Sequence, residues 1–324
     1  MQTKTVGWIL CLLLSIALLL SPGLVLAFDV RLGTGPPGSF SYFSGRVFCR
    51  LINHQLTDIN CQQVAATEDH DAYNLTNLQG GSLDMILVDS HPLFAAVNKT
   101  GMFAYLDIDY NNLRGITSLY ETPVVMVVRN DAGIRSLADL QGKRINGGTP
   151  GTVQYREMKR ILTAKGWSRE DFSLVGDLSR SQSNSDTKAF CYGTMQAMLY
   201  VDIHPDFSLR RLLKSCNGTL LNMDDDDIAS LINADPALWK VEIPAGIYST
   251  QPQKVTTFGS RAMLVASENL DQETVYGIMD VLDKNSAYLQ SAHQALRPFI
   301  PEPGQMDENG LQLHSGAAQY IAEH

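Results

Sequence analysis

The chain has 324 residues and a formal net charge of −9, and 44% of its residues are hydrophobic. A chain of this length is too long for one ordinary hydrophobic core, so we expect two domains. The negative charge argues against nucleic acid and against anionic lipid as partners.

The first 27 residues are typical of a secretory signal peptide. Lys4 supplies a positive charge, an apolar run follows over residues 8–20, and Val25-Leu26-Ala27 is a small-residue cleavage pattern. A retained membrane anchor is the alternative, but a cleaved export signal fits this pattern better. We therefore expect a soluble protein that is exported to the periplasm.

Apart from Cys11 in the apolar run, the cysteines are Cys49, Cys61, Cys191 and Cys216. An even number of cysteines in an oxidising compartment favours disulfides, and three pairings of these four are possible. Cys49 with Cys61, and Cys191 with Cys216, each fall within one apparent βα unit, so we expect these local pairings. Zinc is the alternative, but C-x-x-C and H-x-x-x-H spacings are absent.

Strands and helices are expected to alternate along the chain, which predicts an α/β fold with mainly parallel sheets. Apolar and β-branched runs indicate the strands, and apolar residues at helical spacing indicate the helices. The expected strands lie at residues 30–34, 60–67, 83–88, 123–128, 144–146, 196–203 and 255–266. The expected helices lie at residues 40–52, 72–78, 91–97, 153–162, 224–240 and 272–293.

Two glycine-rich turns, at residues 33–39 and 147–152, each follow a strand and open a helix. Two lobes that direct such turns at a common gap have the geometry of a ligand clamp. We expect the chain to cross between the lobes near residues 121–128 and 255–266. The predicted organisation is a signal peptide at 1–27, a first lobe at 28–122 plus 262–324, and a second lobe at 123–261.

The turn from Gly147 to Thr152 is the most informative local motif. It leads into an amphipathic helix with Tyr155, Met158 and Leu162 on one face. Unpaired backbone N–H groups at the positive end of a helix suit an anionic ligand. The turn lacks the Lys of a Walker loop and the G-x-G-x-x-G spacing, so phosphates are not indicated. An ordinary βα connection is the equally good alternative.

Five segments, in order and at matching spacing, are similar to motifs of one known family. They are LGTGPPGSFSYFSG, LQGGSLDMILVDSHPLFAAVNKTGMF, RNDAGIRSLADLQGKRINGGTPGTV, IPAGIYSTQPQKVTTFG and LHSGAAQYIAEH. Together they resemble the TAXI family, the extracytoplasmic solute receptors of TRAP transporters. The resemblance covers almost all of the chain after the signal peptide. It implies a type II periplasmic binding-protein fold with two lobes, a β-strand hinge and a ligand cleft between the lobes.

The resemblance also implies a function. Such a receptor captures a small carboxylate, for example glutamate, glutamine or 2-oxoglutarate, and delivers it to an ion-driven TRAP membrane permease. We expect a monomer that is not an enzyme and binds no cofactor and no metal. Some members carry cysteines at similar positions, which agrees with the local disulfide pairing. The binding loops implied for this chain contain Ser39, Phe40, Asp89, Ser90, Thr149, Gly151, Thr152, Val153 and His204.

The sequence departs from the family at several of these positions. Asp89 stands where the family usually has Gln, His91 replaces the usual Asp, and the charged loop 67–71 replaces a small, flexible one. A carboxylate only accepts hydrogen bonds, so Asp89 could select the amino group of an amino acid. It could equally cap the following helix. In the first case the amides of 149–153 would hold the ligand carboxylate, and Phe40 or Tyr42 would cover its stem.

Other interpretations stay open at this point. His204 precedes Pro205, so a structural turn is its simpler role. Asp224 to Asp227 lack the spacing and glycine of a calcium loop and predict a helix start. A ligand-sensing module for a membrane receptor is the alternative function on the same fold. An exported hydrolase is disfavoured because a G-x-S-x-G elbow and H-E-x-x-H are absent.

Overall fold

The computed structural model describes residues 27–67, 70–176, 183–298 and 310–324. The predicted signal peptide, apart from Ala27, lies outside these ranges, and so do Glu68 and Asp69 of the charged loop. No helix within the described ranges is both long and apolar enough to cross a membrane.

The observed elements alternate between strand and helix through most of the chain. The strands are β1 (Phe28–Thr34), β2 (Ile59–Ala65), β3 (Met85–Asp89), β4 (Leu113–Arg129), β5 (Arg144–Asn146), β6 (Leu174–Gly176), β7 (Ala197–Val201), β8 (Gly218–Leu221), β9 (Trp239–Ile243) and β10 (Val255–Ser267). The α-helices are α2 (Phe40–Gln55), α3 (His70–Gln79), α4 (Ser90–Val97), α5 (Val153–Lys165), α6 (Ser183–Cys191), α7 (Phe207–Ser215), α8 (Asp226–Ala234), α9 (Gln272–Lys284), α10 (Ser286–Ala292) and α11 (Ser315–Glu323).

Some predicted boundaries are wrong. β4 begins at Leu113, well before the apolar run at 123–128. The helix expected over 224–240 ends at Ala234, because the chain then pairs with β10 as strand β9. The helix expected over 272–293 breaks at Asn285 into α9 and α10. Apolar spacing by itself does not reveal where tertiary pairing interrupts a helix.

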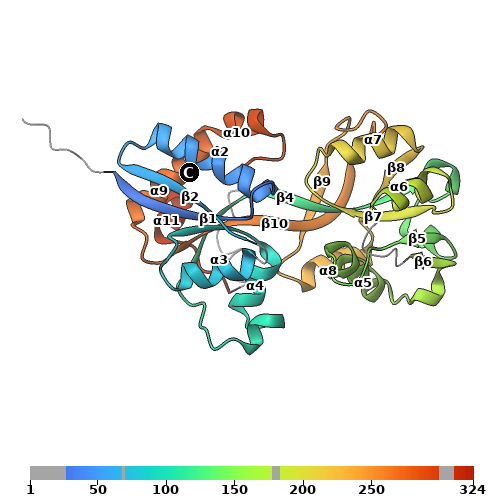
Figure 1. Cartoon of the computed structure of the whole chain (residues 1–324), viewed down its shortest axis with the longest axis horizontal. Helices are drawn as coiled ribbons and strands as arrows, with labels where there is room; N and C mark the ends of the chain where they lie inside the picture. Colours follow the sequence, from blue (N-terminus) through green and yellow to red (C-terminus); the bar gives the residue numbers. More distant parts are fainter. Residues whose placement is uncertain (1–26, 68–69, 177–182, 299–309) are drawn as a thin grey trace, which may run out of the picture.

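One continuous mixed sheet runs through the described molecule (Figure 1). Its strand order is β2-β1-β3-β10-β4-β7-β5-β6, with β8 on β4 and β9 on β10. The outer strands pair in parallel, β1 with β2 and β3, and β5 with β6 and β7. The central strands β4 and β10 pair antiparallel with each other and with their neighbours. The expectation of mainly parallel sheets is therefore wrong at the centre, where both strands run through the whole molecule.

Two lobes share this sheet (Figure 1). The first lobe contains β1–β3, α2–α4 and α9–α11, and its cores surround residues such as Phe48, Leu87 and Leu264. The second lobe contains β5–β9 and α5–α8, with its own cores. Two residues of the second lobe, Ile203 and Ala237, pack into cores of the first. The lobes therefore touch beyond the strands that join them.

β4 and β10 form the connection between the lobes. β4 pairs with β10 from Leu113 to Val124 and with β7 from Val124 to Val128. β10 pairs with β9 over 255–259 and with β3 over 262–266. Each strand thus changes partners near its middle, and the pairing register shifts between Ala262 and Met263. The boundaries at 122/123 and 261/262 remain our proposal, placed at this change of partners.

Two disulfides lie one in each lobe. Cys49–Cys61 joins α2 to β2, and Cys191–Cys216 joins the end of α6 to the residue after α7. These are the local pairings that the sequence predicts. A disulfide that closes a short loop stabilises the folded chain by about 3 kcal/mol, because it restricts the unfolded state.

The run of aspartates at 224–227 opens α8. The Asp225 carboxylate accepts a hydrogen bond from the Ile228 N–H at 3.1 Å and caps the helix. Asp225 and Asp227 both pair with Lys165 of α5. The run therefore starts a helix, as predicted, and also ties α8 to α5.

Candidate functional site

The start of α4 faces the hinge strand β10. Asp89 caps the helix by accepting from the His91 N–H at 2.9 Å, and it also accepts from the Ser260 hydroxyl at 2.6 Å. Ser90 is fully buried and donates to the Ala237 carbonyl at 2.8 Å. Ser90 also accepts from the Arg261 N–H at 3.2 Å. Both predicted residues therefore have structural partners at the hinge.

The start of α5 is the corresponding junction in the second lobe. Thr152 caps the helix by accepting from the Tyr155 N–H at 3.3 Å, and its hydroxyl donates to the Thr149 carbonyl at 2.7 Å. Gly151 has φ +91°, and Val153 is 45% exposed. The Thr152 hydroxyl is thus used within the turn itself. The N–H groups of Gly148 and Thr152 also donate within it, which leaves the N–H groups of Gly151 and Val153 as the contribution of these residues to a ligand.

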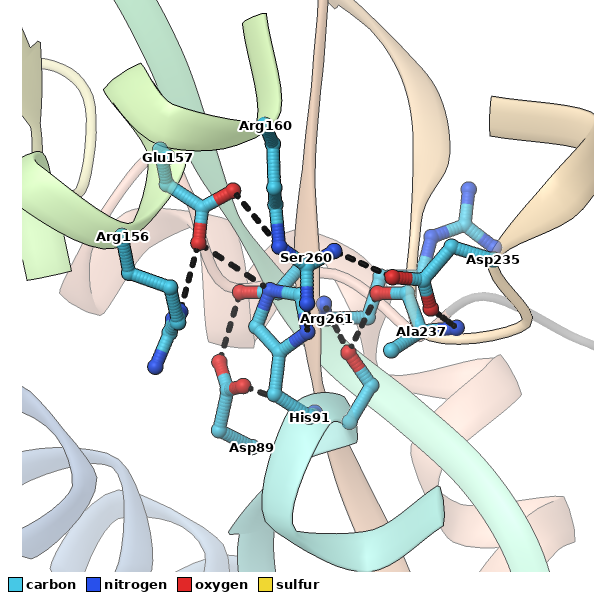
Figure 2. Close-up of polar contacts among 10 residues, drawn as sticks. Asp89, His91, Arg156, Glu157, Arg160, Asp235, Ala237, Ser260 and Arg261 are labelled. Carbon is cyan, nitrogen blue, oxygen red and sulfur yellow. Dashed lines mark hydrogen bonds and ion pairs between the residues drawn. The ribbon is translucent and has the colours of Figure 1, made fainter. Parts of the chain in front are cut away.

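Charged side chains from the two lobes meet between these helix starts (Figure 2). Glu157 Oε1 accepts from Arg156 Nε at 2.8 Å and lies 3.5 Å from His91 Nε2. Arg160 donates from Nη2 to His91 Nδ1 at 3.3 Å, and its Nε lies 3.7 Å from Glu157 Oε2. Arg160 also pairs with Asp235. We call His91, Arg156, Glu157, Arg160 and Asp235 the interlobe cluster.

His91 is neutral in this cluster. Burial, together with the charges of Arg156 and Arg160, lowers the pKa of His91 to about 2. Nδ1 accepts from Arg160, so the ring proton belongs on Nε2, which faces Glu157. Burial raises the pKa of Glu157, while its hydrogen bond from Arg156 and the charge of Arg160 oppose that shift. The cluster therefore holds one buried carboxyl group between two arginines.

The first lobe adds two further carboxyl groups. Burial raises the pKa of Asp71, in the first turn of α3, to about 7, and the charge of Asp89 adds to this shift. Burial also raises the pKa of Asp89, against hydrogen bonds from Ser260 and His91. Arg156 lowers both pKa values by its charge. Asp71, Asp89 and Arg156 thus belong to one electrostatic environment.

A cavity of about 1050 Å³ opens beside the interlobe cluster. Its polar wall includes Asp71, His91, Arg156 and Arg160. Its remaining wall is largely apolar and includes Pro92, Phe94, Met102, Phe103 and Pro236. The cavity is large enough for a small organic ligand and has the mixed lining typical of such sites.

The start of α2 contributes aromatic rings. Ser39 caps the helix by accepting from the Tyr42 N–H at 3.1 Å. The Phe40 ring packs edge to face on Tyr120 and on His293, with centroids 4.8 Å apart in each pair. Burial raises the pKa of Tyr120, and the charges of Asp89 and Asp71 add to that effect. Tyr120 therefore connects the Phe40 wall to the two carboxyl groups.

His204 lies away from the interlobe cluster, in the wall of a second cavity of about 470 Å³. The Tyr248 hydroxyl accepts from the Asp206 N–H at 2.9 Å and lies 2.6 Å from His204 Nδ1, so it donates to that nitrogen. The proton of His204 is then on Nε2, which is buried without a partner among the described residues. Burial lowers the pKa of His204 to about 4, so the ring is neutral.

Asp89 thus lies two residues before His91, which contacts Glu157 of α5, and Phe40 packs on Tyr120. The residues predicted to bind a ligand are not among those that line the cavity beside the interlobe cluster. His204 borders a different cavity. Arg156, Glu157, Arg160 and Tyr120 are site residues that the sequence analysis missed. A charged Arg-Glu pair in the first turns of the helix after the glycine turn was the available signal. Charges at a helix start are usually solvent-exposed, so this pair by itself does not indicate a binding site.

The fold resembles those of solved solute-binding proteins. A TctC solute-binding protein from Polaromonas is 14% identical, with 91% of this chain and 96% of that chain covered and a TM-score of 0.60. The periplasmic sulfonate-binding protein SsuA from Methylobacillus flagellatus KT is 12% identical, with 87% and 77% covered and a TM-score of 0.50. These similarities show a two-lobed α/β periplasmic binding-protein fold.

The model of the NMT1-like family matches residues 32–324. This range contains both glycine turns, both hinge strands and every residue of the interlobe cluster. The chain therefore belongs to the NMT1-like family.

Proposed function

We propose that this protein is an extracytoplasmic solute receptor of the TAXI type, which captures a small carboxylate-bearing solute and delivers it to the ion-driven permease of a TRAP transporter. The contact between the start of α4 and the first turns of α5 supports this proposal most strongly. Asp89 and His91 belong to the first lobe, Arg156 and Glu157 to the second, and strands β4 and β10 join the two lobes. A ligand held there touches both lobes, so its binding and their closure form one equilibrium.

The proposed ligand is an amino acid or another solute with both a nitrogen and a carboxylate. Asp89 offers an acceptor for an ammonium group, and Phe40, with Tyr42, offers a ring to cover the stem. The backbone N–H groups of the turn before α5 suit the carboxylate. The residues proposed to supply these groups are Thr149, Gly151 and Val153, because the Thr152 N–H already donates to the Thr149 carbonyl. Thr152 is proposed to hold the turn in shape, with Ser39 and Ser90 completing the loops. His204 borders a different cavity, so we do not assign its unpartnered Nε2–H to this ligand.

The proposed place of action is the periplasm, after removal of residues 1–27. The proposed role is binding and delivery by a monomer, without catalysis and without a cofactor. Export is tested by the N-terminus of the protein recovered from the periplasm of the native host. A mature chain that begins at Phe28 agrees with the proposed cleavage, and an intact N-terminus contradicts it.

A thermal-shift screen over amino acids, 2-oxo acids and dicarboxylates tests the receptor function. A ligand that binds only the folded state stabilises it by about 2.7 kcal/mol at a hundredfold excess over Kd. We expect at least one amino acid to raise the melting temperature clearly. No shift with any compound of the three classes contradicts the proposed function.

The substitution Asp89→Asn tests the proposed preference for an amino group. Asn keeps the helix cap but removes the negative charge, so we expect the preference for an amino acid over its 2-oxo acid to fall about tenfold. Calorimetric titration of both ligands measures this ratio. The exposed Asp109, which pairs with Lys99 on the surface, supplies the control Asp109→Asn. An unchanged ratio in Asp89→Asn contradicts the assignment.

A further inference from the structure

Arg156 is the cation of the interlobe cluster that a ligand can reach. Its side chain is 45% exposed, whereas the side chains of Glu157 and His91 are 1% and 8% exposed. Together with Asp71, it lines the cavity of about 1050 Å³ beside the interlobe cluster, which we call the interlobe cavity. Arg160 lines the same cavity, but its guanidinium is already engaged by Asp235 and His91.

The guanidinium group of Arg156 is oriented by one hydrogen bond and keeps further N–H donors available for a ligand. Its Nε donates to Glu157 Oε1 at 2.8 Å, and no other hydrogen bond of this guanidinium is found within the described parts of the chain. The Nη groups therefore retain the pair of parallel N–H donors that matches a carboxylate. Glu157 is itself held by His91 and Arg160. A side chain oriented in advance loses less entropy when a ligand binds.

The first lobe presents carboxyl groups on the side of the site opposite Arg156. Asp71 lines the cavity from the first lobe, Asp89 caps the adjoining helix α4, and the charge of Arg156 lowers the pKa of both carboxyl groups. A ligand with only negative charge would meet two acidic groups, and one with only positive charge would meet an arginine. An ammonium group beside Asp71 favours the ionised form of that carboxyl group, so a ligand with both charges can pair with both walls as the lobes close.

We infer that Arg156 binds the carboxylate of the ligand and thereby sets its orientation, with the ammonium end toward Asp71 and Asp89 and the carboxylate end toward α5. This inference rests on the proposed function and adds to it a specificity-determining residue and a direction. The two lobes then have different roles: the first lobe recognises the ammonium end of a zwitterionic ligand, and the second lobe recognises its carboxylate end.

Matched probes separate the two ends. L-glutamine carries both groups, 4-aminobutanamide lacks the carboxylate, and glutaramate lacks the amino group; L-glutamate, 4-aminobutanoate and glutarate form a second set. We expect Arg156→Gln to weaken the binding of the two amino acids about 10- to 100-fold. We expect it to leave the binding of 4-aminobutanamide within about twofold. Calorimetric titration and thermal shift measure both.

Two further variants complete the test. Lys159→Gln removes an exposed cation from the same helix and should leave the affinities for all probes within about twofold. Asp89→Asn should show the reverse pattern to Arg156→Gln, weakening the amine-bearing probes and sparing glutaramate. Arg156→Lys should recover only part of the loss, because an ammonium lacks the paired donors.

The outcomes are distinguishable. Amino-acid affinity that is unchanged in Arg156→Gln overturns the inference and leaves the receptor function standing. An equal loss for the amine without a carboxylate also overturns it, because that loss shows a structural role. Failure of every amino acid, 2-oxo acid and dicarboxylate to bind the unmodified protein contradicts the proposed function itself.

Discussion

The two glycine turns open α2 and α5 by the same local device in the two lobes. A glycine with φ near +90° directly precedes each cap, Gly38 with +93° and Gly151 with +91°. Ser39 and Thr152 then accept a hydrogen bond from the N–H three residues later, at 3.1 and 3.3 Å. At the level of the backbone and the cap, the two junctions are equivalent.

The side chains after the caps differ in kind. Four residues beyond the cap, the first junction has Phe43 and the second has Arg156, and both are partly exposed. Five residues beyond it, Ser44 and Glu157 are both buried. Ser44 donates only to its own helix, whereas Glu157 contacts two arginines and reaches His91 of the other lobe. The glycine turn and cap therefore determine where each helix begins. The residues four and five positions after the cap determine the chemistry of the surface that the helix presents.

The largest expected effect comes from removing Glu157. Glu157→Ala removes a buried side chain and leaves the buried Nε2–H of His91 without its acceptor, which should lower the free energy of unfolding by about 3 kcal/mol. Ser44→Ala, at the equivalent position of the first junction, should cost less than about 1 kcal/mol because only a local helix contact is lost. Denaturant unfolding compares the two. If the two variants lost the same free energy of unfolding, Glu157 would contribute no more to stability than Ser44, and the proposed difference between the two junctions would be wrong.

A smaller effect is expected from crowding within the second turn. Gly148 has φ +89°, and a Cβ there would lie 2.7 Å from the Tyr155 backbone nitrogen. Gly151 has a similar φ, but an added Cβ meets nothing within 4 Å. We expect Gly148→Ala to cost about 2–3 kcal/mol and Gly151→Ala about 1 kcal/mol. Thermal unfolding measures the difference. A Gly151→Ala variant as unstable as Gly148→Ala would contradict the explanation that steric contact of the added Cβ causes the larger loss at Gly148.

The last prediction concerns Asp71, the carboxyl group that the first lobe presents to the start of α5, and the dependence of stability on pH. The folded-state pKa of Asp71, about 7, lies above its ordinary value of 3.8. The folded protein therefore keeps a proton that the unfolded chain releases, and stability falls as the pH rises from about 4 to 7. Asn carries no charge at any pH, so Asp71→Asn should raise the free energy of unfolding above pH 7.

This gain from Asp71→Asn should shrink as the pH falls from 7 toward 4, because the wild-type group is then protonated in the folded and, at last, in the unfolded chain. Thermal unfolding of both proteins from pH 4 to pH 8 checks the trend. A difference that stays constant over this range, or grows toward low pH, would show that Asp71 is not held protonated.

Much of the fold could be predicted because its signals are local. Glycine turns, apolar runs and helix caps indicate where elements begin, so α2, β3 and α5 lie close to their predicted places. The strand after α8 could not be predicted in this way. Residues Trp239–Ile243 become a strand only because β10 is available to pair with them, and such pairing depends on residues distant in the sequence.

The sequence by itself determined the alternation of strands and helices, the local disulfide pairs and the two capped turns, since each depends on neighbours along the chain. Tertiary structure alone decided that His91 and Glu157, far apart in sequence, share one buried site. It also decided that Arg156 is reachable while Arg160 is engaged. The physical reason is that burial and charge pairing between lobes arise from the path of β4 and β10, which no local pattern records.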